Sequence, residues 1–352
     1  MFFSMRQNRF LHIIKLCCGT MPYFGANRSL RSYGGICLAA LVLSLLCACG
    51  GADRKAQTEL RDAGIAAISA GDYDAAYEHF KEAIACGGSR VSEREIDLTY
   101  YLAACSFLRG DFDEAIASYD NLIAYDKKNA DAYFLRGSVY LQQEKQGKAL
   151  EDYRKATSIA NKDYELAIAI YNNLSKNGLK KEGMQFIDAA SRIGGDDSES
   201  LFYRGRIYQI LGQNGVAKTT FSRAMETGSD EAAVYLARAY KKDGQKKKAK
   251  KLAEKYSKNT DNLDSKHSQI AGELLLIVGK YKKANKIYDQ ALKAELEQEE
   301  KSVWYKDLLK GQIAALEYCG EFEQARTLAR EYIESYPSDA HMARELSFLE
   351  MR

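Results

Sequence analysis

Small and aromatic side chains recur along most of the chain at a spacing that predicts helices. The segment GDYDAAYEHFKEAI, residues 71–84, places Ala76 and Phe80 four residues apart, which is one turn along one face of a helix. The segment GDFDEAIASYDNLI, residues 110–123, repeats this order of charged, small and aromatic positions. Further segments of the same kind begin at residues 144, 178, 212, 244, 279 and 320. With only 2 prolines in 352 residues, the pattern predicts an all-α chain built from a repeated unit.

The repeated unit resembles the tetratricopeptide repeat, an antiparallel pair of helices about 34 residues long. The resemblance covers residues 57–337 and implies about eight helix pairs stacked as a right-handed α-solenoid, in which each pair buries its apolar face against its neighbours. Residues 338–352 are expected to form a capping helix, because Met342, Leu346 and Leu349 fall on one stripe that can cover the last pair.

The first 48 residues differ from the rest, because they contain Lys and Arg but no Asp or Glu. Within them, residues 36–48 form an apolar run that is too short to cross a bilayer and has the length of a signal-peptide core. We expect residues 1–48 to be a signal peptide. Met21 would give a more usual signal length than Met1, so residues 1–20 are expected to be an extension ahead of the true start.

The end of this run, Leu46-Cys47-Ala48-Cys49, resembles the bacterial lipobox. The resemblance implies that Cys49 receives a diacylglyceryl group and becomes the first residue, with residues 49–56 as lipidated terminus and linker. It also implies a bacterial cell-envelope location, with the protein anchored to the membrane and facing outside the cytoplasm. The alternatives are a short N-terminal membrane helix, or a plain signal peptide cleaved after Ala48.

Charge gives no case for nucleic-acid binding. Five of the chain's 51 basic residues lie in the first 48 positions. The remainder therefore has 46 basic residues against 48 acidic residues, which is nearly neutral. The exception is a local basic cluster, which has two interpretations: a solvated helix face, or a contact with anionic lipid headgroups or an anionic cell-wall polymer. The basic cluster consists of Lys246, Lys247, Lys248, Lys250 and Lys251.

The sequence offers no arrangement suited to catalysis, a metal or a cofactor. His79, His267 and His341 are far apart, and the cysteines include no C-x-x-C pair. Without predicted strands, there is no strand to precede a phosphate-binding glycine loop. We therefore expect no enzyme activity, no metal and no cofactor.

In the tetratricopeptide family, the first helix of each pair lines a groove in which a peptide or partner helix binds. The fifth position of this helix is apolar in five consecutive units, and the ninth position of two of them is arginine. Such an apolar strip would be a recognition surface if exposed; the alternative is that it packs inside the array. The strip is Tyr100, Phe134, Ile168, Phe202 and Val234, and the arginines are Arg206 and Arg238.

These observations favour a lipid-anchored scaffold or adaptor outside the cytoplasm that binds a protein or peptide partner in the groove. Envelope or cell-wall assembly is the setting that we expect, by analogy with other anchored repeat proteins. The alternative is a receptor for a secreted peptide or a small extracellular ligand, which a deep apolar pocket would favour.

Overall fold

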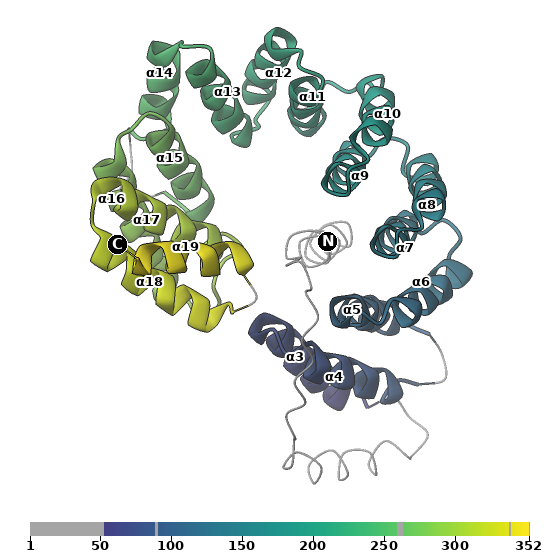
Figure 1. The fold of residues 1–352 in the computed structure, drawn as a ribbon. Coiled ribbons are helices and arrows are strands. Elements are labelled where there is room, and N and C mark those ends of the chain that lie inside the picture. The colour runs from purple at the N-terminus through teal and green to yellow at the C-terminus, as the bar shows by residue number, and fades with distance from the viewer. Residues whose placement is uncertain (1–52, 89–90, 259–262, 338, 352) are drawn as a thin grey trace. The chain divides into compact units, whose positions relative to one another are not determined.

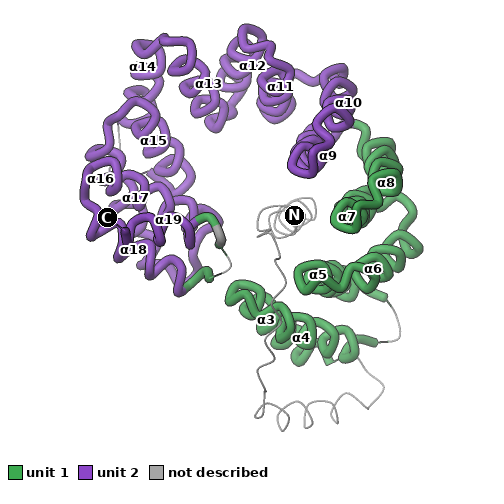
Figure 2. The backbone as a smooth tube through the Cα atoms, in the orientation of Figure 1, with its two compact units in different colours: residues 1–161, 335–341 green, residues 162–334, 342–352 purple. Residues whose placement is uncertain are grey.

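The computed structural model describes residues 53–88, 91–258, 263–337 and 339–351 (Figure 1). These residues form helices and no strands, which confirms the all-α prediction for the described part of the chain. The predicted signal peptide and Cys49 lie outside the described residues. The chain divides into two compact units, shown in different colours in Figure 2. Unit 1 consists of residues 1–161 and 335–341, and unit 2 of residues 162–334 and 342–352.

Unit 1 is built from pairs of consecutive helices. Each pair packs closely, α3 with α4, α5 with α6 and α7 with α8, and α4 and α6 also contact the helix that follows them. The helices are α3 (Arg54–Ala70), α4 (Tyr73–Ala85), α5 (Glu93–Arg109), α6 (Phe112–Tyr125), α7 (Ala130–Gln142) and α8 (Gln146–Ile159).

Unit 2 continues the same arrangement. In Figure 1 the first helices of its pairs, α9, α11, α13 and α15, lie side by side along one edge, and the second helices lie along the other. The helices are α9 (Tyr164–Lys176), α10 (Lys180–Ser191), α11 (Ser198–Ile210), α12 (Asn214–Glu226), α13 (Glu231–Lys242), α14 (Lys246–Tyr256), α15 (Ser265–Ile277), α16 (Tyr281–Leu296), α17 (Tyr305–Cys319), α18 (Phe322–Ser335) and α19 (Ala340–Glu350).

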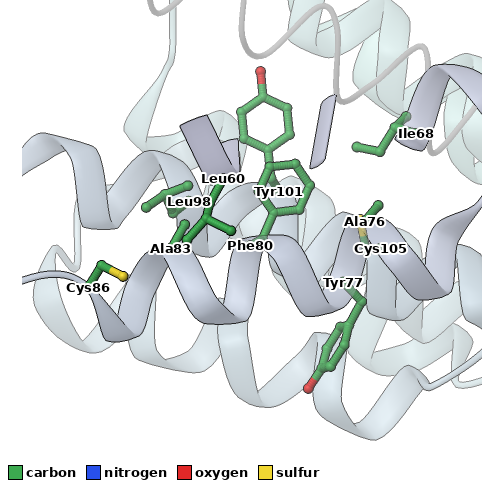
Figure 3. Packing of buried hydrophobic residues seen from close by; sticks show 10 residues of the cluster. All are labelled: Leu60, Ile68, Ala76, Tyr77, Phe80, Ala83, Cys86, Leu98, Tyr101 and Cys105. Atoms are coloured by element: carbon green, nitrogen blue, oxygen red, sulfur yellow. The ribbon is translucent and has the colours of Figure 1, made fainter. Parts of the chain in front are cut away.

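The repeated small and aromatic residues form contacts within a pair and between consecutive pairs. Ala76 and Phe80 of α4 are fully buried, and the Phe80 ring stacks on Tyr101 of α5 with 5.0 Å between centroids (Figure 3). A Cβ added to Gly64 of α3 would lie 2.7 Å from the Phe80 ring, so only glycine allows this approach. The small and aromatic positions of the sequence pattern therefore mark where α3 and α4 cross most closely.

The first helix of a pair is followed by a residue with positive φ, a backbone conformation that glycine adopts without steric cost. Gly71 (φ 76°) and Gly110 (φ 86°) end α3 and α5 in this way. After α7 the same backbone conformation is taken by Glu144, whose φ is 59°. Glu144 is the one non-glycine residue with positive φ among the described residues, and the turn there is consequently strained.

The helix expected near the C-terminus is present as α19. Met342 and Leu349 are buried, and Leu346 is half-buried, as the predicted stripe requires. Arg326 Nε of α18 donates to the Leu349 carbonyl at 3.2 Å, and Arg330 pairs with Glu350. These contacts hold the end of α19 against α18.

Candidate binding surface

Four of the five residues of the apolar strip are buried rather than exposed. Tyr100, Phe134, Ile168 and Val234 are each at most 5% exposed, so the expectation of a continuous exposed strip is wrong at these positions. The cause is packing within the pair: the Tyr100 ring lies 6.5 Å from Tyr119, and the Phe134 ring 5.6 Å from Tyr153. The alternative interpretation, packing inside the array, holds for these four residues.

Phe202 of α11 is the exception, because it stays half-buried within a group of aromatic rings. Its ring centroid lies 5.2 Å from Tyr203 and 5.3 Å from Tyr235 of α13, both in edge-to-face geometry. Such pairs are stabilised by the charge distribution of the rings as well as by burial. Phe221 of α12 lies beneath them, 5.5 Å from Tyr235 and 6.4 Å from Phe202.

Arg206 lies over this aromatic group, one turn after Phe202 on α11. Its guanidinium carbon is 5.8 Å from the Phe202 ring, 5.6 Å from Tyr203 and 5.7 Å from Tyr235. Each distance permits a cation–π interaction. Arg206 is half-buried and forms no ion pair within 4.0 Å with the described residues. The Arg206 guanidinium is therefore packed against aromatic rings rather than paired with a carboxylate. Its N–H groups can donate hydrogen bonds to a bound anion.

Arg238 occupies the equivalent position of the next pair but has a different partner. It forms an ion pair with Glu273 of α15, and its guanidinium carbon lies 5.8 Å from the Tyr235 ring. Tyr235 therefore contacts both arginines. The group Phe202, Tyr203, Arg206, Tyr235 and Arg238 is called the aromatic–arginine surface below.

Glu165 of α9 forms one border of this surface. Burial raises its pKa, although a hydrogen bond from Tyr203 and the positive charge of Arg206 both lower it. Burial also raises the pKa of Tyr203, as do the charge of Glu165 and the hydrogen bond to it.

Gly205 allows the aromatic rings to lie this close to the backbone of α11. A Cβ added at Gly205 would lie 2.5 Å from Phe221 Cε1 and 2.6 Å from Phe221 Cδ1. Any larger residue would therefore displace the Phe221 ring, which contacts Tyr235.

Sequence reasoning identified Phe202, Arg206 and Arg238 but not Tyr203 and Tyr235. Both tyrosines stand at the sixth position of their first helix, immediately after the strip residue. Tyrosine at the same position of two consecutive pairs is the signal that could have identified them.

The basic cluster lies on α14, and its five lysines are all exposed. They differ in their contacts. Lys248 lies 5.3 Å from the Tyr240 ring, and Lys250 lies 3.9 Å from Glu254. Lys246, Lys247 and Lys251 form no ion pair within 4.0 Å with the described residues.

Neither a metal-binding cluster nor a membrane-spanning helix is present among the described residues. No group of three or more His, Cys, Asp or Glu side chains in the described ranges is arranged to hold a metal ion. No helix among the described residues combines the length and apolar character needed to cross a membrane. Cys105 is buried and forms no disulfide with a described residue.

Curated proteins similar to this chain match it over limited segments. The chain is 29% identical over 104 residues to protein SLOW GREEN 1, chloroplastic, of Arabidopsis thaliana, covering 29% of this chain and 33% of that protein. It is 24% identical over 164 residues to Protein O-mannosyl-transferase TMTC1 of Homo sapiens, covering 46% of this chain and 18% of that protein. The matches thus span a third or less of these relatives.

Two solved structures resemble the chain at low sequence identity. A tetratricopeptide repeat protein from Parabacteroides merdae is 17% identical, with a TM-score of 0.39, covering 85% of this chain and all of that one. Yeast Tom70 is 13% identical, with a TM-score of 0.36, covering 84% of this chain and 88% of that one.

Two family models match the chain directly. A model described as TPR repeat matches residues 107–144, and a model described as tetratricopeptide repeat matches residues 130–163. The matched segment lies within the helix pairs α5–α6 and α7–α8 and the residues that follow them. The chain therefore contains tetratricopeptide repeats, recognised as such over residues 107–163.

Proposed function

We propose that this protein is a scaffold that binds a segment of a partner protein on the aromatic–arginine surface. The observation that carries the proposal is Arg206, which is held over three aromatic rings without a carboxylate within 4.0 Å among the described residues. Tyrosine and arginine are among the residue types enriched at the energetic centres of protein–protein interfaces, which supports this choice of surface.

The chemistry of the surface indicates what the partner segment contains. A guanidinium can donate two parallel hydrogen bonds to a carboxylate, and the rings beside it can pack against an apolar side chain. Two carboxylates, Glu165 and Glu273, border the two arginines of the surface. The segment that fits is one in which an acidic side chain neighbours an aliphatic or aromatic residue.

A pull-down from the cells that make the protein tests this proposal. The wild type is compared with Arg206→Ala and with Arg192→Ala, a matched control because Arg192 is an exposed arginine of the same unit. A partner protein should be recovered with the wild type and the control and should be lost with Arg206→Ala. Equal recovery with all three proteins would contradict the site. Retention of a small molecule instead of a protein would favour the receptor alternative.

We further propose that Cys49 carries the lipid anchor and that the repeats face outside the cytoplasm in the cell envelope. The support is the sequence Leu46-Cys47-Ala48-Cys49 after an apolar run. A clickable fatty acid should label the wild type and the Cys47→Ala variant but not Cys49→Ala. Labelling of Cys49→Ala would contradict the anchor without affecting the proposed binding surface.

A further inference from the structure

Exposed lysines recur at the same positions of two consecutive second helices in unit 2. Alignment of the segments that begin at residues 244 and 279 pairs Lys247 with Lys282 and Lys251 with Lys286. All four side chains are exposed. Lys247 and Lys251 are one turn apart on α14, on the side opposite the buried Ala249 and Ala253. Lys282 and Lys286 have the same relation on α16 and, with the α14 pair, are called the lysine rows below.

The two rows belong to one surface, because α14 and α16 are joined by side-chain contacts. Lys280 Nζ at the start of α16 lies 3.4 Å from Glu254 Oε1 near the end of α14. Lys283 Nζ donates to the Ser257 carbonyl at 3.0 Å. Figure 1 shows both helices along the same edge of unit 2, away from the first helices that carry the aromatic–arginine surface.

The nearby carboxylates pair with other lysines and leave the rows uncompensated. Glu254 lies 3.9 Å from Lys250 as well as contacting Lys280, and Asp289 lies 2.8 Å from Lys293. Asp243, before α14, pairs with Lys218. The four lysines of the rows form no ion pair within 4.0 Å with the described residues. The rows are therefore a local excess of positive charge on a chain whose charges nearly balance in total after residue 48.

We propose that the lysine rows bind the surface of an anionic phospholipid bilayer. Two adjacent helices present ammonium groups that can reach many headgroups at once, and lysine serves this contact as a flexible point charge. A single-stranded nucleic acid would instead use exposed aromatic rings for base stacking. Tyr240 and Tyr256 do not offer this, because Lys248 lies over the Tyr240 ring and Lys255 over the Tyr256 ring. The proposal requires neither the lipid anchor nor the partner site.

Vesicle binding by the full chain tests the proposal. The probes are vesicles of phosphatidylcholine alone and vesicles that also contain phosphatidylglycerol, and the readout is the ratio of the two affinities. Each lysine near an anionic surface contributes roughly a fivefold gain in affinity. Changing Lys247, Lys251, Lys282 and Lys286 to Gln should therefore reduce the ratio by at least about tenfold. Because the ratio compares one protein on two surfaces, a contribution of the apolar residues 36–48 to both affinities cancels.

The matched control changes Lys127, Lys128, Lys155 and Lys162 to Gln, which removes the same charge from exposed positions elsewhere. The control should keep the wild-type ratio, and circular dichroism should show equal helix content in all three proteins. Equal losses in variant and control would overturn the proposal, as would a wild type without preference for anionic vesicles. Duplex DNA bound as tightly as the vesicles, with the same dependence on the four lysines, would also overturn it in favour of general polyanion binding.

Discussion

Arg206 of α11 and Tyr235 of α13 belong to consecutive helix pairs, and the guanidinium carbon lies 5.7 Å from the ring centroid. Tyr235 also contacts Phe202 and Phe221 of the preceding pair. The aromatic–arginine surface is therefore formed by two repeats together, and its geometry depends on how tightly they pack.

Gly205→Ala should disturb this packing. The added methyl group would lie 2.5 Å from the Phe221 ring, and overpacking of this kind costs about 1–3 kcal/mol, which outweighs the roughly 1 kcal/mol that alanine gains in helix propensity. Urea unfolding followed by circular dichroism measures the change. Gly215→Ala in α12 is the control, since nothing lies within 4 Å of its added Cβ. Equal stability of the two variants would show that the close approach is unimportant.

Glu144→Gly should stabilise the fold. Glu144 holds a φ of 59°, a conformation that costs a side-chain-bearing residue about 1 kcal/mol and costs glycine little. We expect the free energy of unfolding to rise by up to about 1 kcal/mol. Glu151→Gly, at an exposed position inside α8, should lower it by a similar amount. A lower thermal midpoint for Glu144→Gly than for the wild type would contradict the strain at this turn.

Asp152→Ala should destabilise unit 1 far more than Asp120→Ala, although both carboxylates bind Arg136. Arg136 donates to Asp152 from Nε at 2.9 Å and from Nη2 at 2.7 Å, and the Asp152 side chain is only 6% exposed. Removing Asp152 deletes both of these charged hydrogen bonds and leaves the half-buried Arg136 with Asp120 as its remaining carboxylate partner, at a cost of about 3 kcal/mol. The Asp120 side chain is 52% exposed, so its loss should cost under about 1 kcal/mol. Chemical denaturation of the two variants measures both values, and equal losses would contradict this difference.

Glu95 should make the stability of the fold depend on acid pH. Burial alone would raise its pKa, but hydrogen bonds from Ser92 and Gln57 outweigh burial and lower the pKa from 4.5 to about 2. A carboxyl group with a lowered pKa stabilises the folded state above its unfolded pKa, and this contribution disappears as pH falls through the folded value. Glu95 also forms a capping box with Ser92, which glutamine at this position can form too, so Glu95→Gln removes the charge and keeps a side chain able to cap.

Glu95→Gln should therefore be less stable than the wild type at pH 7, and the difference should shrink between about pH 4.5 and 2. Unfolding curves at several pH values, with Glu93→Gln as the exposed control, measure this dependence. A difference that stays constant with pH would contradict the assignment to the carboxylate.

The helix pairs were predictable because their closest contacts depend on residue size. A small residue recurs at the position of Ala76 in every repeat and an aromatic residue at the position of Phe80 in most of them, and the structure buries these residues as the pattern requires. The partner site was only partly predictable, because the fifth position of the first helix has no fixed environment. The Phe134 side chain packs on Tyr153 of its own pair and is buried. The Phe202 side chain instead contacts Arg206 and Tyr235 of the next pair and stays half-buried. Such differences depend on neighbours from another repeat, which residue spacing does not report.

Site-specific photo-crosslinking tests the central claim most directly. Glu199 is exposed on α11, two turns before Arg206 and on the same face, so a photoreactive residue there would lie beside the proposed site. In cells it should crosslink a partner protein, and adding Arg206→Ala should abolish the crosslink. The same probe at the exposed Glu226 of α12 should not capture that partner. Capture of the same partner from both positions, or capture from position 199 that survives Arg206→Ala, would contradict the aromatic–arginine surface as the binding site.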